Sequence, residues 1–318
     1  MAAAPVPSRS MASSAHAAGE VPKRGVMPFV RAVLLAVPLL CVSPAHAQNQ
    51  PRPALVDRVQ AEHARTNGDD GAARPVENIA FNNRVIDLYV PATLPPSGAR
   101  SLLVVLHGGM GNSAGVRRSL DMDGMADRYG FLIAYLNGTP SRASDRMRIW
   151  NAGECCGLAQ RENVDDVGYI TAAVRLLEQT YGVDPGRVYG LGHSNGAMMT
   201  QRVMCETGLY QAAVPIAGPL ELDTRSCPAA RGKRIMAIHG TSDENVPIAG
   251  GRGKGVAGVA FRSEDETKRI FERSGTSYRL LTVENASHDP ASIREAMARS
   301  GGSMSEEIVR FLGLAQSK

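Results

Sequence analysis

The order of apolar segments along the chain constrains the fold most. From Ile79 onward, short runs rich in β-branched residues alternate with longer stretches of helical periodicity. Strands are expected at residues 84–90, 102–106, 131–135, 188–191, 212–216, 235–238 and 279–283. Helices are expected at residues 118–128, 166–181, 195–206, 264–273 and 304–312. Such alternation predicts an α/β fold, with a mostly parallel sheet covered by helices on both faces, in a single domain at residues 79–318.

Composition and charge exclude several classes of protein. Hydrophobic residues make up 43% of the 318 residues and charged residues 21%, as in ordinary globular proteins and unlike disordered or multispan membrane proteins. The net charge is +4, but four of the 35 basic and one of the 31 acidic residues precede Gln48, which leaves 31 against 30, or +1. A balance so close to zero favours neither nucleic acid nor an acidic membrane surface as a partner.

The first 47 residues have the pattern of a secretory signal peptide. A basic segment ending at Arg31 precedes an apolar run at residues 32–42, and Ala45-His46-Ala47 is typical of a cleavage site. The run is too short to span a membrane, so no membrane span is expected. We therefore predict a secreted or periplasmic protein, with Met27 as an alternative start. Residues 48–78 are polar and are expected to form an N-terminal arm.

Four cysteines remain after the signal peptide, namely Cys155, Cys156, Cys205 and Cys227. Three pairings are possible, and in an exported protein disulfides persist. We favour Cys205 with Cys227, because one ends a predicted helix and the other lies in the loop after the next strand. Cys155 and Cys156 then form a vicinal pair or stay as two thiols. The spacing does not match a zinc site, and no metal is expected.

The pentapeptide at residues 192–196, GHSNG, lies where a predicted strand gives way to a predicted helix. This is the context of a G-x-S-x-G nucleophile elbow, in which a sharp turn exposes a serine and leaves room only for glycine beside it. The pattern indicates Ser194 as a nucleophile. The alternative is that Ser194 only caps the helix.

A second glycine motif, His107-Gly108-Gly109, follows an earlier predicted strand. In hydrolases with the elbow, this position supplies half of the oxyanion hole. We expect the backbone N–H of Gly109 as one donor, with Met110 as the neighbouring alternative, and that of Asn195 as the other. A simple turn at the end of the strand would also explain the glycines, and His107 is expected to be structural.

The acid and the base must follow the serine in this arrangement, and both candidates follow later strands. Asp243 comes after the strand at 235–238, and His288 after the last strand. The imidazole would remove the serine proton, and the carboxylate would orient the imidazole. The alternatives are His239 as the base and Glu244 or Asp289 as the acid, since both of these carboxylates adjoin a favoured residue.

At this point the chain resembles the extracellular α/β-hydrolase esterases that are polyhydroxybutyrate depolymerase-like or feruloyl-esterase-like. The resemblance covers about residues 80–313 and rests on segments 106–109 (LHGG), 150–153 (WNAG), 155–157 (CCG), 164–168 (VDDVG), 192–196 (GHSNG), 239–243 (HGTSD) and 246–247 (VP). It implies an α/β-hydrolase fold and carboxylic ester hydrolysis by Ser194, Asp243 and His288, without a cofactor. The chain departs from the family around His288, where 286–290 (ASHDP) replaces the usual glycines and aromatic residue.

Substrate contacts are less defined by the sequence. Trp150 and Met110 are expected to contact the substrate, with core packing as the alternative for Trp150. Asp165 and Asp166 precede a predicted helix, which favours a capping role over catalysis. Only about seventeen residues, 217–233, separate the two strands between which relatives insert a lid, so no lid domain is expected.

The sequence therefore predicts an exported serine esterase that acts on hydroxyalkanoate polyesters or oligomers, or on similarly accessible esters. A feruloyl or acetyl esterase acting on plant polysaccharide is the alternative. An acyltransferase and a secreted binding protein without activity are alternatives of a different class, and the oligomeric state is not predicted.

Overall fold

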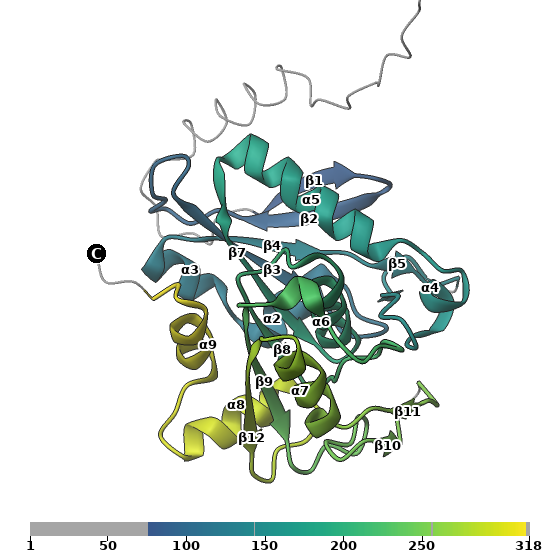
Figure 1. Ribbon diagram of the computed structural model, residues 1–318. Coiled ribbons are helices and arrows are strands. Elements are labelled where there is room, and N and C mark those ends of the chain that lie inside the picture. The colour runs from purple at the N-terminus through teal and green to yellow at the C-terminus, as the bar shows by residue number, and fades with distance from the viewer. Residues whose placement is uncertain (1–75, 143, 256, 316–318) are drawn as a thin grey trace, which may run out of the picture. The chain divides into compact units, whose positions relative to one another are not determined.

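The computed structural model describes residues 76–142, 144–255 and 257–315, which belong to one compact unit of the chain. The predicted signal peptide at 1–47 and nearly all of the predicted arm at 48–78 lie outside these residues. Figure 1 shows a central sheet with helices on both sides. Within the described part of the chain, no helix is long and apolar enough to cross a membrane.

The central sheet has the order β1-β2-β4-β3-β7-β8-β9-β12. Its strands are β1 (Glu77–Phe81), β2 (Arg84–Tyr89), β3 (Arg100–Leu106), β4 (Leu132–Leu136), β7 (Val183–His193), β8 (Ala212–Ile216), β9 (Arg234–Gly240) and β12 (Ser277–Val283). β1 and β2 pair antiparallel, β2 also runs antiparallel to β4, and the remaining strands are parallel. The predicted mostly parallel sheet is confirmed. β1 was not predicted, and it begins inside the segment assigned to the arm.

Helices cover the two faces of the sheet as predicted (Figure 1). One apolar core lies between the sheet and α5 (Asp166–Tyr181), α6 (Asn195–Thr207) and α7 (Glu264–Arg273). A second core lies on the opposite face, against α2 (Ser113–Leu120), α3 (Asp123–Tyr129), α8 (Pro290–Arg299) and α9 (Met304–Leu312). The apolar stripes of these helices supply the buried side chains, which is the main source of their stability.

The structure corrects the helix that was predicted at 118–128. The chain forms α2 and α3 instead, because Asp121 adopts the left-handed conformation, with φ of 50°, and ends α2. It also adds α8, which the apolar pattern did not predict; Asp289 caps its first turn and Pro290 occupies its first position. The remaining additions are short: α4 (Gly157–Arg161), the pair β5 (Thr139–Pro140) and β6 (Arg148–Ile149), and the pair β10 (Gly251–Arg252) and β11 (Ala260–Phe261).

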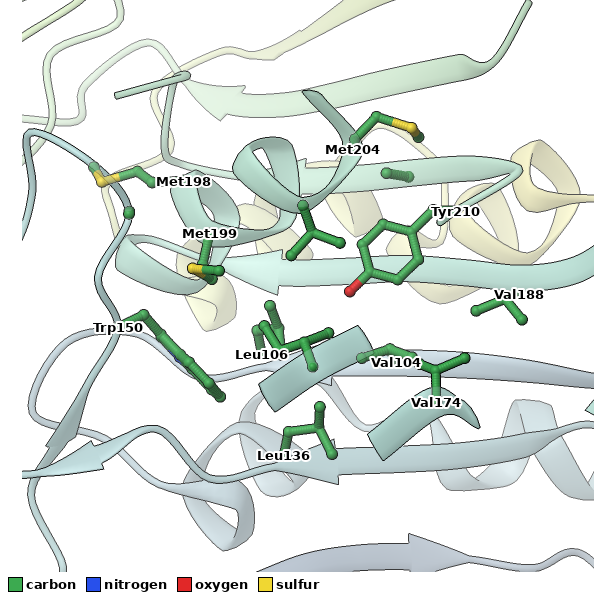
Figure 2. Close-up of a cluster of buried hydrophobic side chains, with 14 of the residues drawn as sticks. Val104, Leu106, Leu136, Trp150, Val174, Val188, Met198, Met199, Met204 and Tyr210 are labelled. Carbon is green, nitrogen blue, oxygen red and sulfur yellow. The ribbon is translucent and has the colours of Figure 1, made fainter. Parts of the chain in front are cut away.

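The core beneath α5 and α6 is shown in Figure 2. Trp150, Leu106 and Tyr210 are among its fully buried members, between the sheet and the two helices. Burying large side chains of this kind stabilises the fold by about 1.5–3 kcal/mol each before the loss of conformational entropy. Since Trp150 and Leu106 lie next to the predicted catalytic loops, this core also supports them.

The parallel strands bring the predicted site residues to one edge of the sheet. Leu106, the last residue of β3, pairs with Gly192 of β7, so the glycine motif after β3 begins beside the elbow. β9 and β12 are neighbours and end in register, with Gly240 opposite Val283. Between β8 and β9 the chain forms only a loop with one short 3-10 helix, Pro228–Ala230, which agrees with the predicted absence of a lid domain.

Candidate active site

Ser194 occupies a strained turn between β7 and α6. Its φ is 55° and its ψ is −124°, a conformation that side-chain-bearing residues adopt rarely and at a cost. A Cβ on Gly192 would collide with the carbonyl oxygen of Gly196, and a Cβ on Gly196 would collide with those of Leu106 and His107. The spacing of the glycines therefore has a direct steric reason, as expected for an elbow.

The Ser194 side chain does not cap α6. The serine lies at the N-cap position, but its hydroxyl makes no capping hydrogen bond. Ser194 Oγ lies 2.9 Å from Nε2 of His288 instead. The capping alternative is thus not what the structure shows.

His288 connects Ser194 to Asp243. Its Nδ1 donates to Oδ2 of Asp243 at 2.7 Å, which leaves Nε2 free to accept the hydrogen of the serine hydroxyl. The structure therefore brings the three predicted residues, from three separate loops, into one continuous line of hydrogen bonds. The geometry is that of a nucleophile, a general base and an orienting carboxylate.

Asp243 is held on every side by donors. Its Oδ1 accepts the backbone N–H groups of Asn245 and Val246, both at 2.9 Å, while Oδ2 faces His288 and lies 3.3 Å from Nε2 of His239. Burial raises the pKa of the Asp243 carboxyl, but the contacts with His239 and His288 outweigh burial and hold this pKa well below its usual range. Asp243 is therefore a carboxylate throughout the physiological pH range.

The alternative acids and base have other positions. Glu244 is exposed and pairs with Lys254 at 2.7 Å. Asp289 accepts the backbone N–H of Ala291 and caps α8. His239 lies behind Asp243 and contacts Asp243, Val246 and Glu264, so it does not take the position of the base.

His193, the residue before the nucleophile, contacts the loop of the base. Its Nε2 lies 2.9 Å from the carbonyl oxygen of His288, and since a carbonyl only accepts, Nε2 carries the hydrogen. Burial lowers the pKa of His193 to about 4, so the ring is neutral at pH 7. The residue ties the backbone of His288 to the elbow.

The two predicted oxyanion-hole segments are adjacent. A Cβ on Gly108 would lie 3.3 Å from Cβ of Ser194, and one on Gly109 would lie 3.7 Å from Cβ of Asn195. Among the described residues, the backbone N–H groups of Gly109 and Asn195 have no hydrogen-bond partner. Gly108 also accepts the N–H of Gly111 in a turn, so the turn and the predicted role coexist.

Trp150 corrects a prediction, because its side chain is fully buried and does not face a substrate. Its indole N–H donates to the carbonyl oxygen of His107 at 2.9 Å. Its backbone pairs with the side chain of Asn195: Oδ1 accepts the Trp150 N–H at 2.8 Å and Nδ2 donates to the Trp150 carbonyl at 3.1 Å. The packing alternative was right, and Trp150 joins the two segments that carry Gly109 and Asn195.

Met110 and His107 flank this region. Met110 has a φ of 63° and the residue is 43% exposed, which leaves it available to a substrate. His107 is buried, and its Nε2 accepts the N–H of Gly138 at 3.0 Å. Burial lowers the pKa of His107 to about 4, so the ring is neutral and structural, as predicted.

The two acidic residues at the start of α5 have different tasks. Asp165 caps the helix, since Oδ1 accepts the N–H of Gly168 at 2.8 Å. Asp166 is buried, pairs with Arg84 at 2.6 Å and accepts the N–H of Asn151 at 2.7 Å. It thereby anchors the loop that follows Trp150.

The structure bonds Cys205 to Cys227, the pairing favoured from the sequence, and the two are 22 residues apart in the chain. The bond joins the last turn of α6 to the loop before the 3-10 helix. The adjacent Cys155 and Cys156 form the other bonded pair.

Three features of the site were missed by sequence reasoning. They are the pairing of the Asn195 side chain with Trp150, the tie from His193 to His288, and the contacts of His239 with Glu264 and Asp243. Each joins residues from different loops, so no local pattern pointed to them. The one available signal was that His239, an ionisable residue, directly follows the apolar run at 235–238.

Comparison with known proteins finds relatives that are named as esterases. NocK of Nocardia uniformis subsp. tsuyamanensis, an esterase by name, is 28% identical over 210 residues, which are 65% of this chain and 59% of NocK. Feruloyl esterase B of Piromyces equi is 27% identical over 179 residues, which are 55% of this chain and 32% of that protein. The chain thus spans less than two thirds of the length of either relative. No protein-family model matches it.

Solved structures establish the fold. The acetyl xylan esterase from Aspergillus awamori superposes with a TM-score of 0.53 at 15% identity, covering 76% of this chain and 100% of that one. Identity this low supports a common fold and no shared substrate. The chain therefore has the α/β-hydrolase fold, and its sequence is similar to those of NocK and of the feruloyl esterase.

Proposed function

We propose that the protein is an exported serine esterase that hydrolyses carboxylic esters through an acyl-enzyme on Ser194. The observation that carries the proposal is the unbroken line of hydrogen bonds from Asp243 through His288 to Ser194, at 2.7 and 2.9 Å. The strained elbow and the two unpartnered N–H groups beside it support the same chemistry.

In the first half of the reaction, Ser194 Oγ bonds to the carbonyl carbon of the ester while Nε2 of His288 takes the hydroxyl proton. The carbonyl electron pair moves onto its oxygen, and the N–H groups of Gly109 and Asn195 donate to the resulting oxyanion. The pair then returns, the bond to the alcohol oxygen breaks, and His288 gives the proton to the departing alcohol.

In the second half, a water molecule replaces the alcohol. His288 takes a proton from the water as its oxygen bonds to the acyl carbon, and the second tetrahedral species loses Ser194, which recovers the proton. Asp243 keeps the imidazole in the tautomer that both halves require, because Nδ1 must carry the hydrogen.

The ester itself is a second part of the proposal. Similarity to the feruloyl esterase of Piromyces equi favours an aromatic acyl ester. The hydroxyalkanoate substrate expected from the sequence stays a prediction, and the short connection between β8 and β9 is compatible with either. We propose a small or polymer-borne ester of one of these two kinds.

The test compares turnover of p-nitrophenyl acetate, butyrate and octanoate, methyl ferulate and a 3-hydroxybutyrate oligomer. Ser194→Ala should lower turnover by about 10⁴-fold or more, since the residues act as a unit. Ser242→Ala is the matched control, because Ser242 is exposed beside Asp243 and should keep wild-type activity. A fluorophosphonate probe should label the wild type once, at Ser194, by peptide mass spectrometry.

Turnover of Ser194→Ala close to that of the wild type would overturn the proposal. The best substrate among the five chooses between the polyester and feruloyl hypotheses. Hydrolysis replaced by ester transfer when an alcohol is added would favour an acyltransferase, and a folded protein inert toward all five would favour a binding protein. A mature N-terminus at Gln48, determined on protein from the medium or periplasm, tests export.

A further inference from the structure

His239 is a titratable residue in the interior that the reaction above does not use. It is the penultimate residue of β9 and has no exposed surface. Its Nδ1 lies 2.8 Å from Oε1 of Glu264, and its Nε2 lies 2.8 Å from the carbonyl oxygen of Val246. The same Nε2 is 3.3 Å from Oδ2 of Asp243, the oxygen that receives the hydrogen bond from His288.

The surroundings determine the charge of this ring. A carbonyl oxygen can only accept, so Nε2 carries a hydrogen, and the Glu264 carboxylate requires a hydrogen on Nδ1 as well. The other oxygen of Glu264 accepts the Tyr278 hydroxyl at 2.9 Å. With a hydrogen on both nitrogens, the ring is an imidazolium.

The charges around the ring agree with this assignment. A buried cation is stable only when it is paired, and here Glu264 on α7 and Asp243 after β9 face it from opposite nitrogens. Tyr278 on β12 and His288 after β12 lie behind these two carboxylates. Burial lowers the pKa of His239, but the contacts with Asp243 and Glu264 outweigh burial and raise it to about 10.

We propose that His239 is a positioning residue of the catalytic triad, a buried cation matched by Glu264 that orients Asp243 and moderates its charge toward His288. This inference rests on the proposed function, because it acts through Asp243. Oδ2 of Asp243 then lies between two imidazole rings, one that transfers protons and one that stays charged.

The charge of His239 affects how the activity depends on pH. The cation beside Asp243 weakens the attraction of this carboxylate for the proton that His288 takes up. If the cation is removed, Asp243 holds that proton more strongly, and the base becomes free only at higher pH. The acidic limb of kcat/KM reports the protonation of the base in the free enzyme, so this limb should move.

Glu264→Gln is the informative variant. The glutamine amide can donate to Nδ1 of His239 and its oxygen can still accept the Tyr278 hydroxyl, so the ring becomes neutral without a cavity or an unpaired group. We expect the acidic limb of kcat/KM to move to higher pH by about half a pH unit or more, with a lower kcat. Glu266→Gln is the matched control, since Glu266 is a half-exposed glutamate of the same helix paired with Arg262, and its limb should stay in place.

A second measurement reads the charge of His239 directly. In ¹⁵N-labelled wild-type protein at pH 7, NMR should show hydrogens on both ring nitrogens of His239, and in Glu264→Gln only on Nε2. This readout needs no activity, so it stands apart from the test of Ser194. It also decides the matter alone if Glu264→Gln does not fold.

A neutral His239 in the wild type would overturn the inference. The inference would also be wrong if Glu264→Gln folds, its His239 is neutral, and the acidic limb of kcat/KM does not move. The ring would then have only a structural role. If the proposed function itself is wrong, Ser194→Ala will keep full activity, whatever the NMR result.

Discussion

At the scale of single residues, four histidines near the serine differ through their surroundings alone. His107 is buried and His193 half-buried beside backbone groups, and removal from water lowers the pKa of each to about 4. His239 is as buried as His107 but faces two carboxylates, which raise its pKa to about 10. His288 is the partly exposed ring that contacts Ser194. One residue type thus provides two neutral supports, the proposed cation and the proposed base.

Trp150→Phe tests how the segments beside Ser194 are held together. Phenylalanine keeps an aromatic ring in the core but cannot donate to the His107 carbonyl, which is then buried without this partner. An unsatisfied buried group costs about 1–3 kcal/mol. Because the lost hydrogen bond fixes the segment that carries Gly109, the donors of the proposed oxyanion hole should be held less firmly. We expect kcat to fall about tenfold with little change in KM, measured on the best substrate.

Tyr169→Phe is the matched control for this prediction. Tyr169 packs against Trp150, with 6.5 Å between ring centroids, and its hydroxyl has no hydrogen-bond partner among the described residues. Removing that hydroxyl should leave kcat unchanged. Equal losses in the two variants would mean that core packing, and not the indole hydrogen bond, supports the site.

At the scale of elements, the elbow between β7 and α6 depends on close contact with β3. Gly196 lies against the carbonyl oxygens of Leu106 and His107, at the point where β3 ends. The strand pairing of β3 with β7 therefore sets the distance between the nucleophile and the Gly108–Gly109 segment. The glycines of the elbow are required by packing between two strands as well as by the turn itself.

Gly196→Ala should destabilise the fold by about 3 kcal/mol or more, because backbone atoms of two segments would have to move. Gly124→Ala is the matched comparison: Gly124 lies in α3, with open space around an added Cβ, and alanine there should stabilise the protein by about 0.5 kcal/mol. Urea unfolding of the two variants measures both effects. Equal stability of the two variants would contradict the steric account of the elbow.

At the scale of the whole molecule, stability depends on pH through buried groups other than the proposed triad. Glu221, in the connection from β8 to β9, is buried and accepts the backbone N–H of Arg262 at 2.9 Å. Burial raises the pKa of Glu221 to about 7, although Arg262 opposes the shift. The folded protein therefore holds this proton more tightly than the unfolded chain does.

Because the folded protein holds this proton more tightly, its stability falls as the pH rises. The contribution of Glu221 to stability is present at low pH and is lost as the pH rises from about 4.5 to about 7. Glu221→Gln keeps an acceptor for Arg262 but does not titrate. Relative to this variant, the wild type should lose about 2 to 3 kcal/mol of unfolding free energy between pH 5 and pH 8, measured by urea titration. If the unfolding free energies of the two proteins changed in parallel with pH, the pKa of Glu221 would not be raised in the folded protein.

Much of the architecture followed from the sequence because it depends on local patterns. Strand and helix periods and the glycines around Ser194 are visible within a few residues of one another, and the order of serine, acid and base can be read along the chain. The predicted sheet and most predicted helices were therefore right. The break at Asp121 and the helix α8 were missed, because a left-handed residue and a proline-initiated helix leave only a weak apolar pattern.

The sequence by itself determined the class of fold, its mostly parallel sheet, and Ser194, Asp243 and His288 as the residues whose side chains meet. Only the tertiary structure decided that Trp150 is a core residue, that Asn195 pairs with it, and that His239 lies behind Asp243. The physical reason is that these contacts join segments distant in the chain. Burial and charge at such positions depend on which loops meet at the edge of the sheet, and no period along a single segment records that.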